Sequence, residues 1–216
     1  IGFDNIPRKS FKFQTLPSNN KKVALDQKIR TYLTNLGFFE CINNPFSAEE
    51  LSTSIFVDNP LDSSKRFLRC SSKNSLVQNL VFNQRRQKET IKLFEISDFY
   101  SKEGNNISSK RKLGIICSGR VDKTFPYFNQ KIDKNFLMNI FSPLDNSYKL
   151  SVEEIPYEKI KSKKKEKIFY SEIELSKIEK LMENISEQSL FFRDGLKYKK
   201  ISEFPSTSRD ISFLIN

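Results

Sequence analysis

Glycine is the residue type that most constrains the fold of this chain. The 216 residues contain six glycines, and none lies between Gly119 and Gly195. No GxxxxGK[ST] or GxGxxG string occurs anywhere in the sequence. P-loop and Rossmann sites need such glycines, because their backbone must approach a phosphate closely. The sequence therefore excludes both, whereas a nucleotide site built from arginines on an antiparallel sheet needs less glycine.

Histidine is absent from the sequence, which narrows the possible chemistry. This excludes Ser-His-Asp and Cys-His nucleophiles and most zinc enzymes, and it removes the commonest general base near neutral pH. Carboxylates and lysines stay open as catalytic groups. The three cysteines, Cys41, Cys70 and Cys117, are far apart and odd in number, which is typical of reduced core thiols. We expect a cytoplasmic protein with no metal site, and no membrane association because no apolar run approaches transmembrane length.

The spacing of apolar residues predicts three amphipathic helices. Residues 23–36 have helical periodicity and end at Gly37, a typical C-cap residue. A second stripe runs over residues 76–81 and a third over residues 132–141. We expect the second stripe to face the core, and the first and third are candidates for packing against a partner protein.

Shorter apolar runs predict strands. Residues 38–42 fit a buried strand, and residues 168–173 fit another. The runs 91–100 and 113–117 flank the polar turn Gly104-Asn105-Asn106, which is typical of a β-hairpin with a loop longer than two residues. Strands and helices together predict an α+β fold with an antiparallel sheet.

A net charge of +11 favours an anionic partner, with nucleic acid as the first candidate. The candidate phosphate-binding residues form a lysine run: Lys161, Lys163, Lys164 and Lys165. The alternative is a solvated loop in a lysine-rich protein. Arg85 and Arg86, near the end of the second helix, are candidates for binding carboxylates on a partner, and simple solvation is again the alternative.

Several strings, in order along the chain, have a common resemblance. VDNPL at 57–61, FLR at 67–69, NLVFNQRR at 79–86 and KLFEISDFY at 92–100 resemble the catalytic-like module of the bacterial phenylalanyl-tRNA synthetase β subunit. The opening IGFDNIP resembles the exit from that subunit's preceding helical domain. The closing KKISEFPSTSRDISFLI resembles the first part of its ferredoxin-like anticodon-binding domain. We therefore expect an internal stretch of a larger protein.

The resemblance implies a class II aminoacyl-tRNA synthetase-like antiparallel sheet flanked by helices. It divides the chain into a linker (residues 1–22), a non-catalytic class II-like module (23–195) and the start of the anticodon-binding domain (196–216). In that family the α subunit uses ATP to attach phenylalanine to tRNA(Phe), and the β module packs on α in an α2β2 heterotetramer. The resemblance implies that the holoenzyme uses ATP and Mg²⁺ and that this chain alone binds neither.

The residues agree with a non-catalytic copy of that module. A working class II site has an Arg-x-Glu strand and a glycine-rich element that ends in a second Arg. Here Cys70 and Ser71 follow Arg69, and the second element would fall in the glycine-free stretch. We therefore expect no catalytic residue, and a salt bridge or interface role for Arg69. Glu95 is expected to pair with a buried cation. Two alternatives stay open, a free-standing RNA-binding module and an active ligase with a diverged site.

Overall fold

A five-stranded sheet forms the centre of the computed structural model, in the order β1-β4-β5-β7-β6. The structure describes residues 5–7, 21–122, 129–145, 149–160, 162, 164–183, 203–204 and 212. The strands of the sheet are β1 (Phe39–Glu40), β4 (Thr90–Glu103), β5 (Asn106–Gly119), β6 (Glu153–Ile155) and β7 (Ile168–Glu174). Strand β1 runs parallel to β4, and all other pairs are antiparallel.

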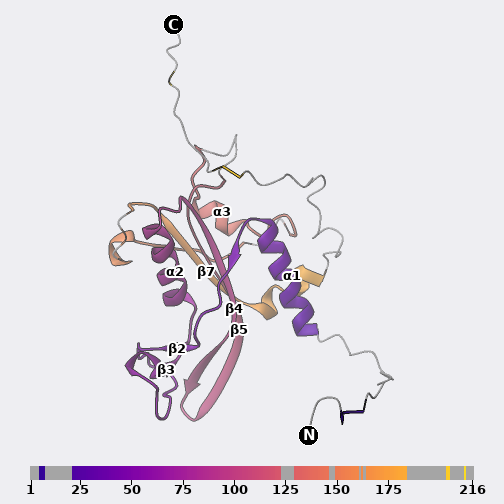
Figure 1. Ribbon diagram of the computed structural model, residues 1–216, viewed down its shortest axis with the longest axis vertical. Coiled ribbons are helices and arrows are strands. Elements are labelled where there is room, and N and C mark those ends of the chain that lie inside the picture. The colour runs from indigo at the N-terminus through magenta and orange to yellow at the C-terminus, as the bar shows by residue number, and fades with distance from the viewer. Residues whose placement is uncertain are drawn as a thin grey trace.

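The longest strands are the two of the β4–β5 hairpin, which extends beyond the rest of the sheet (Figure 1). Glu103 pairs with Asn106, so the loop consists of Gly104 and Asn105. Gly104 has a φ of +59°, which side chains with a Cβ rarely adopt. The predicted hairpin is confirmed, but the expectation of a longer loop is wrong, because the turn glycine allows a two-residue connection.

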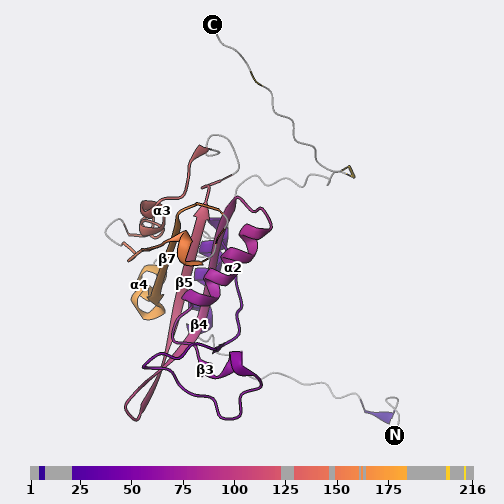
Figure 2. The same cartoon turned by 90° about the vertical axis from the view of Figure 1, so that its left-hand side faces the viewer.

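Helices cover both faces of the sheet. Helix α2 (Lys73–Arg85) lies on one side, and α1 (Lys21–Asn35), α3 (Lys134–Met138) and α4 (Glu179–Glu183) lie on the other (Figures 1 and 2). Short elements complete the described chain: β2 (Phe46–Ser47), β3 (Phe67–Leu68), and the 3-10 turns η2 (Ser63–Lys65), η4 (Tyr157–Ile160) and η5 (Leu175–Lys177). None of the helices in the described ranges has the length and hydropathy needed to cross a lipid bilayer.

Each face of the sheet has its own hydrophobic core. Leu76 and Leu80 of α2 pack on one face, as the second stripe predicted. Ile29 and Leu33 of α1 are fully buried on the other face, and so is Leu137 of α3. The expectation that the first and third stripes contact a partner is therefore wrong, because the chain buries them in its own core.

The edge strand β1 differs from the buried strand that the sequence predicted. Phe38 is buried, but Phe39 is 72% exposed and Ile42, just beyond the strand, is 95% exposed. The reason is that β1 lies at the edge of the sheet, and its described length is two residues. Two of the exposed large apolar side chains of this chain thus lie at or next to a sheet edge.

Gly114 of β5 sets how closely α2 approaches the sheet. A Cβ at this position would overlap the hydroxyl of Ser72, which immediately precedes α2, and would touch Leu76. The first turn of α2 therefore lies directly on the strand. This close approach brings polar groups of α2, β4, β5 and β7 together.

Most residues of the two predicted flanking segments lie outside the described ranges. These are the linker, residues 1–22, and the start of the anticodon-binding domain, residues 196–216. The predicted division into domains therefore stays a prediction.

Candidate functional site

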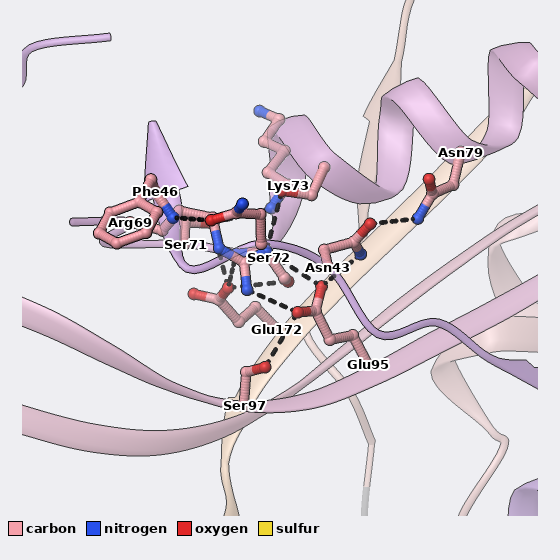
Figure 3. Close-up of polar contacts among 12 residues, drawn as sticks. Asn43, Phe46, Arg69, Ser71, Ser72, Lys73, Asn79, Glu95, Ser97 and Glu172 are labelled. Carbon is pink, nitrogen blue, oxygen red and sulfur yellow. Dashed lines mark hydrogen bonds and ion pairs between the residues drawn. The ribbon is translucent and has the colours of Figure 1, made fainter. Parts of the chain in front are cut away.

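A buried ion pair joins the segment after β3 to the middle of β4 (Figure 3). Arg69 Nη2 lies 2.6 Å from Glu95 Oε1, and Arg69 Nη1 lies 3.2 Å from Glu95 Oε2. The two side chains are 5% and 0% exposed. Ser97 and Asn43 donate further hydrogen bonds to the carboxylate, and Arg69 Nη1 also donates to Ser75. This bidentate geometry is the strong form of charge pairing, so both charges are compensated within the chain.

The expectation that Glu95 pairs with a buried cation is confirmed. The sequence offered no carboxylate two residues after Arg69, yet the fold supplies one from a different strand. An interface role for Arg69 is not tested by this contact and stays a prediction.

A second buried cluster surrounds Glu172 of β7, which contacts the residues that immediately precede α2 (Figure 3). Its Oε1 accepts hydrogen bonds from the Ser72 backbone N–H at 2.8 Å, from the Ser71 and Ser72 hydroxyls and from the Tyr170 hydroxyl, each at 3.0 Å. Its Oε2 accepts one from Lys112 Nζ at 2.9 Å. The negative carboxylate lies at the N-terminal end of α2, where the helix dipole favours it.

These contacts shift the pKa values of Glu172 and Tyr170 away from neutral pH, in opposite directions. Burial raises the pKa of Glu172, but the hydrogen bonds from Ser72 and Lys112 outweigh burial and hold it below its usual range. Burial, and then the nearby Glu172 charge, raise the pKa of Tyr170. Glu172 is therefore ionised and Tyr170 protonated at neutral pH, and neither is suited to exchange a proton there.

Sequence reasoning missed the Glu172 cluster, although a signal for it exists. Tyr170 and Glu172 are two residues apart on β7, so their side chains share one face of the sheet. A polar residue on the core-facing side of a strand needs a partner. The identity of that partner depends on sheet register, which places Gly114 opposite Glu172 and Lys112 one pair further along the face.

We call the two clusters together the α2 N-terminal network; it comprises Arg69, Glu95, Ser71, Ser72, Lys112, Tyr170 and Glu172. An incoming triphosphate would have to compete with Glu95 for the guanidinium of Arg69. The network thus suits a structural role better than phosphate transfer. Within the described ranges, no group of three or more Cys, Asp or Glu side chains is arranged to hold a metal ion.

A cleft of about 1260 Å³ lies at the β1 edge of the sheet, between β4 and α3. Lys92 lines it, is 9% exposed, and donates a hydrogen bond to the Leu36 carbonyl at 3.3 Å. Burial lowers the pKa of Lys92. Phe39 lines the mouth of the same cleft. This edge therefore combines exposed apolar surface with a buried amine.

The predicted lysine run lies partly outside the described residues, since Lys161 and Lys163 are not among them. The structure places Lys164 against the end of α2, where its Nζ donates to the Lys88 carbonyl at 2.9 Å. Lys165 is exposed beside it. Their predicted contact with nucleic acid is not tested by the geometry alone.

Arg85 and Arg86 lie at this same end of α2, and both are exposed. The Arg86 guanidinium lies 3.4 Å from the centre of the Phe82 ring, and its Nη1 donates to the Phe82 carbonyl at 3.2 Å. The structure thus brings together two sets of basic residues that are almost eighty positions apart in the sequence. Their predicted interface role stays a prediction.

Residues 6–160 match the family described as the phenylalanyl tRNA synthetase beta chain CLM domain. Over 127 residues the chain is 31% identical to the phenylalanine–tRNA ligase beta subunit of Coxiella burnetii, covering 55% of this chain and 16% of that protein. An alignment of 256 residues with the same subunit of Buchnera aphidicola subsp. Baizongia pistaciae has 24% identity and covers 100% of this chain and 31% of that protein.

Among solved structures, a pyrrolysyl tRNA synthetase from Desulfitobacterium hafniense matches with a TM-score of 0.55 and 16% identity, covering 75% of this chain and 69% of that one. This likeness shows the fold, an α+β fold like that of a class II synthetase catalytic domain. The chain spans less than a third of the length of the two curated relatives.

Proposed function

The chain belongs to the family of phenylalanyl-tRNA synthetase beta chain CLM domains, and we propose that it is a non-catalytic scaffold for the active site on a separate α subunit. In this proposal the α subunit binds ATP and Mg²⁺ and attaches phenylalanine to tRNA(Phe). The two kinds of subunit form an α2β2 heterotetramer in the cytoplasm. The chain is then part of a ligase without carrying its chemistry.

The observation that carries this proposal is the bidentate pair of Arg69 with Glu95. Both side chains are buried and hydrogen-bonded to other groups of the chain. Turning Arg69 toward a phosphate would leave the Glu95 carboxylate buried without its counter-charge, which costs roughly 3–5 kcal/mol. Arg69, the candidate for the phosphate-binding arginine of a class II site, thus stabilises the fold through Glu95.

The β1 edge supports the scaffold role. Phe39 and Ile42 expose large apolar surfaces at or next to β1, the outer strand of the sheet in the part of the chain that the structure describes. Such an edge is normally covered, because exposed strands with apolar side chains associate with other proteins. We place the α subunit on this edge.

The first test is exchange of labelled pyrophosphate into ATP in the presence of phenylalanine. The chain alone is expected to give background exchange, and the complete α–β complex robust exchange. Robust exchange by the purified chain would refute the non-catalytic assignment and favour an active ligase with a diverged site.

The second test is assembly of the whole β subunit with its α subunit, measured by co-purification. The double substitution Phe39→Ser and Ile42→Ser is expected to reduce the yield of complex strongly. Leu51→Ser with Leu61→Ser is the matched control, since these leucines are also exposed but belong to the segment between β2 and η2, outside the five-stranded sheet. Equal yields of complex from both variants would remove the β1 edge from the proposed interface.

A further inference from the structure

A small cavity lies between the C-terminal end of α2 and the segment that precedes β7. Its volume is about 300 Å³, and its lining residues are Val81, Gln84, Arg85, Gln87 and Lys164. The orange segment before β7 lies beside the end of α2 in Figure 1. Two hydrogen bonds hold it there, from the Ser162 hydroxyl to Gln84 Oε1 at 2.6 Å and from Lys164 Nζ to the Lys88 carbonyl at 2.9 Å.

Gln84 is the unusual residue of this cavity. Its side chain is 5% exposed, and its amide oxygen accepts the Ser162 hydrogen bond. Its Nε2 is buried and has no hydrogen-bond partner within the part of the chain that the structure describes. A buried donor left unpaired loses its hydration without gaining a hydrogen bond in return. A ligand with an acceptor oxygen would satisfy this donor if the Gln84 side chain turned toward the cavity that it lines.

The groups around Gln84 are cationic. Arg85, Lys88 and Lys165 are exposed, and Lys164 is half-buried. Among the described residues, none of these four forms an ion pair with a carboxylate. We call Gln84 and these four cations the α2 C-terminal patch. The neighbouring carboxylates Glu89 and Glu166 reduce the local charge without reversing it.

An aromatic and guanidinium stack lies at the same end of α2. Phe82 is 54% exposed and carries the Arg86 guanidinium on its ring. The two residues are four positions apart, so they share one side of the helix. A guanidinium plane held in this way can stack on an unpaired nucleobase.

We infer that the cavity of the α2 C-terminal patch binds a phosphate group of an RNA backbone, with an adjoining base on the Arg86 and Phe82 stack. Lys164 and Arg85 compensate the charge of the phosphate, and Gln84 Nε2, which is covered in the free chain, donates to a phosphate oxygen once its side chain turns into the cavity. This inference rests on the proposed function in one respect: tRNA is the RNA that such a subunit meets.

The test is fluorescence anisotropy of a labelled oligouridylate and of a labelled tRNA transcript with the full chain, over a potassium chloride series. The triple variant Arg85→Gln, Lys88→Gln and Lys165→Gln is expected to bind on the order of ten-fold more weakly at low salt, and the slope of log K against log [salt] should fall by about 2. Lys102→Gln, Lys177→Gln and Lys180→Gln form the matched control, because these lysines are exposed and lie elsewhere. The control lowers the net charge equally and should change binding little.

A second variant addresses the cavity itself. Gln84→Glu keeps the side-chain size but places a carboxylate where the phosphate would lie. It is expected to weaken RNA binding at least as much as the triple variant. Inorganic phosphate should displace RNA from the wild-type chain better than chloride at equal ionic strength. Circular dichroism spectra check that each variant is folded.

Three outcomes would overturn the inference. One is equal loss of RNA binding in the patch and control variants, because net charge alone would then explain it. Another is binding of inorganic phosphate that depends on Gln84 while RNA binding does not, which makes this a site for free phosphate. The last is loss of assembly with the α subunit but not of RNA binding, which makes it a protein interface. If RNA binding fails while assembly stays intact, the proposed scaffold function still stands.

Discussion

The two ends of helix α2 carry charge in opposite ways. At the N-terminal end, Arg69, Glu95, Lys112 and Glu172 are largely or fully buried and each is paired with an opposite charge. At the C-terminal end, the cations of the α2 C-terminal patch are mostly exposed and without a carboxylate partner in the described structure. The first end uses its charges to fix the fold, whereas the second end leaves them available to a ligand.

The difference has a physical basis in desolvation. A buried pair is retained because removing one partner leaves the other charge without compensation in a low-dielectric interior. Exposed cations lose little hydration free energy when they contact an external phosphate, and the release of the phosphate's counterions favours binding. A net charge of +11 does not distinguish these two situations, but the positions of the carboxylates do.

The largest expected effect on stability comes from breaking the Arg69–Glu95 ion pair at the N-terminal end of α2. Glu95→Gln should lower the free energy of unfolding by roughly 3–5 kcal/mol, because Arg69 is then buried with its charge uncompensated. Urea unfolding followed by circular dichroism measures the change. Glu153→Gln is the matched control, since Glu153 pairs with Lys73 but is 54% exposed, and its loss should cost no more than about 1 kcal/mol. Equal losses would mean that burial does not separate the two kinds of pair.

Glu172 sharpens the comparison through pH. Its pKa in the folded chain lies below the ordinary value, so its stabilisation is complete above the ordinary glutamate pKa and is lost as the pH falls through the folded-state value. Glu172→Gln should cost about 2 kcal/mol at neutral pH, since a charge-assisted hydrogen bond to the largely buried Lys112 is lost. The substituted chain should also lose less stability on acidification than the wild type. Parallel stability–pH curves would contradict this account.

The sequence predicted the elements better than the contacts between them. Helix α1 with Gly37 at its end, the β4–β5 hairpin and the strand β7 follow from local periodicity and turn residues. The Arg69–Glu95 pair was predicted only in part. A carboxylate inside an apolar strand needs a cation as its partner, but the pattern did not identify that cation as Arg69. Local sequence patterns could not predict the Glu172 cluster or the cavity at Gln84. Both join residues from 60 to 101 positions apart, and whether these residues meet depends on how α2 lies across the sheet.

Lys92 is an intermediate case, buried like the residues of the first end but with a backbone carbonyl as its hydrogen-bond acceptor. Burial lowers its pKa, which means that the folded chain disfavours its charged form. Lys92→Met keeps the aliphatic stem and removes the charge, so it should raise the free energy of unfolding by on the order of 1 kcal/mol at neutral pH. The gain should shrink at alkaline pH, where the folded wild type also loses the charge. A clear loss of stability would show that the amine contributes a favourable contact at the cleft.

The smallest effect on stability is expected at the exposed end. Arg85→Gln removes a cation from the last turn of α2, where it interacts with the helix dipole and with no carboxylate among the described residues. The free energy of unfolding should fall by a few tenths of a kcal/mol, or about 0.5 at most, and the change should diminish with added salt. The same substitution should weaken RNA binding measurably. A loss of stability as large as that of Glu95→Gln would mean that Arg85 belongs to the fold, and the contrast between the two ends of the helix would fail.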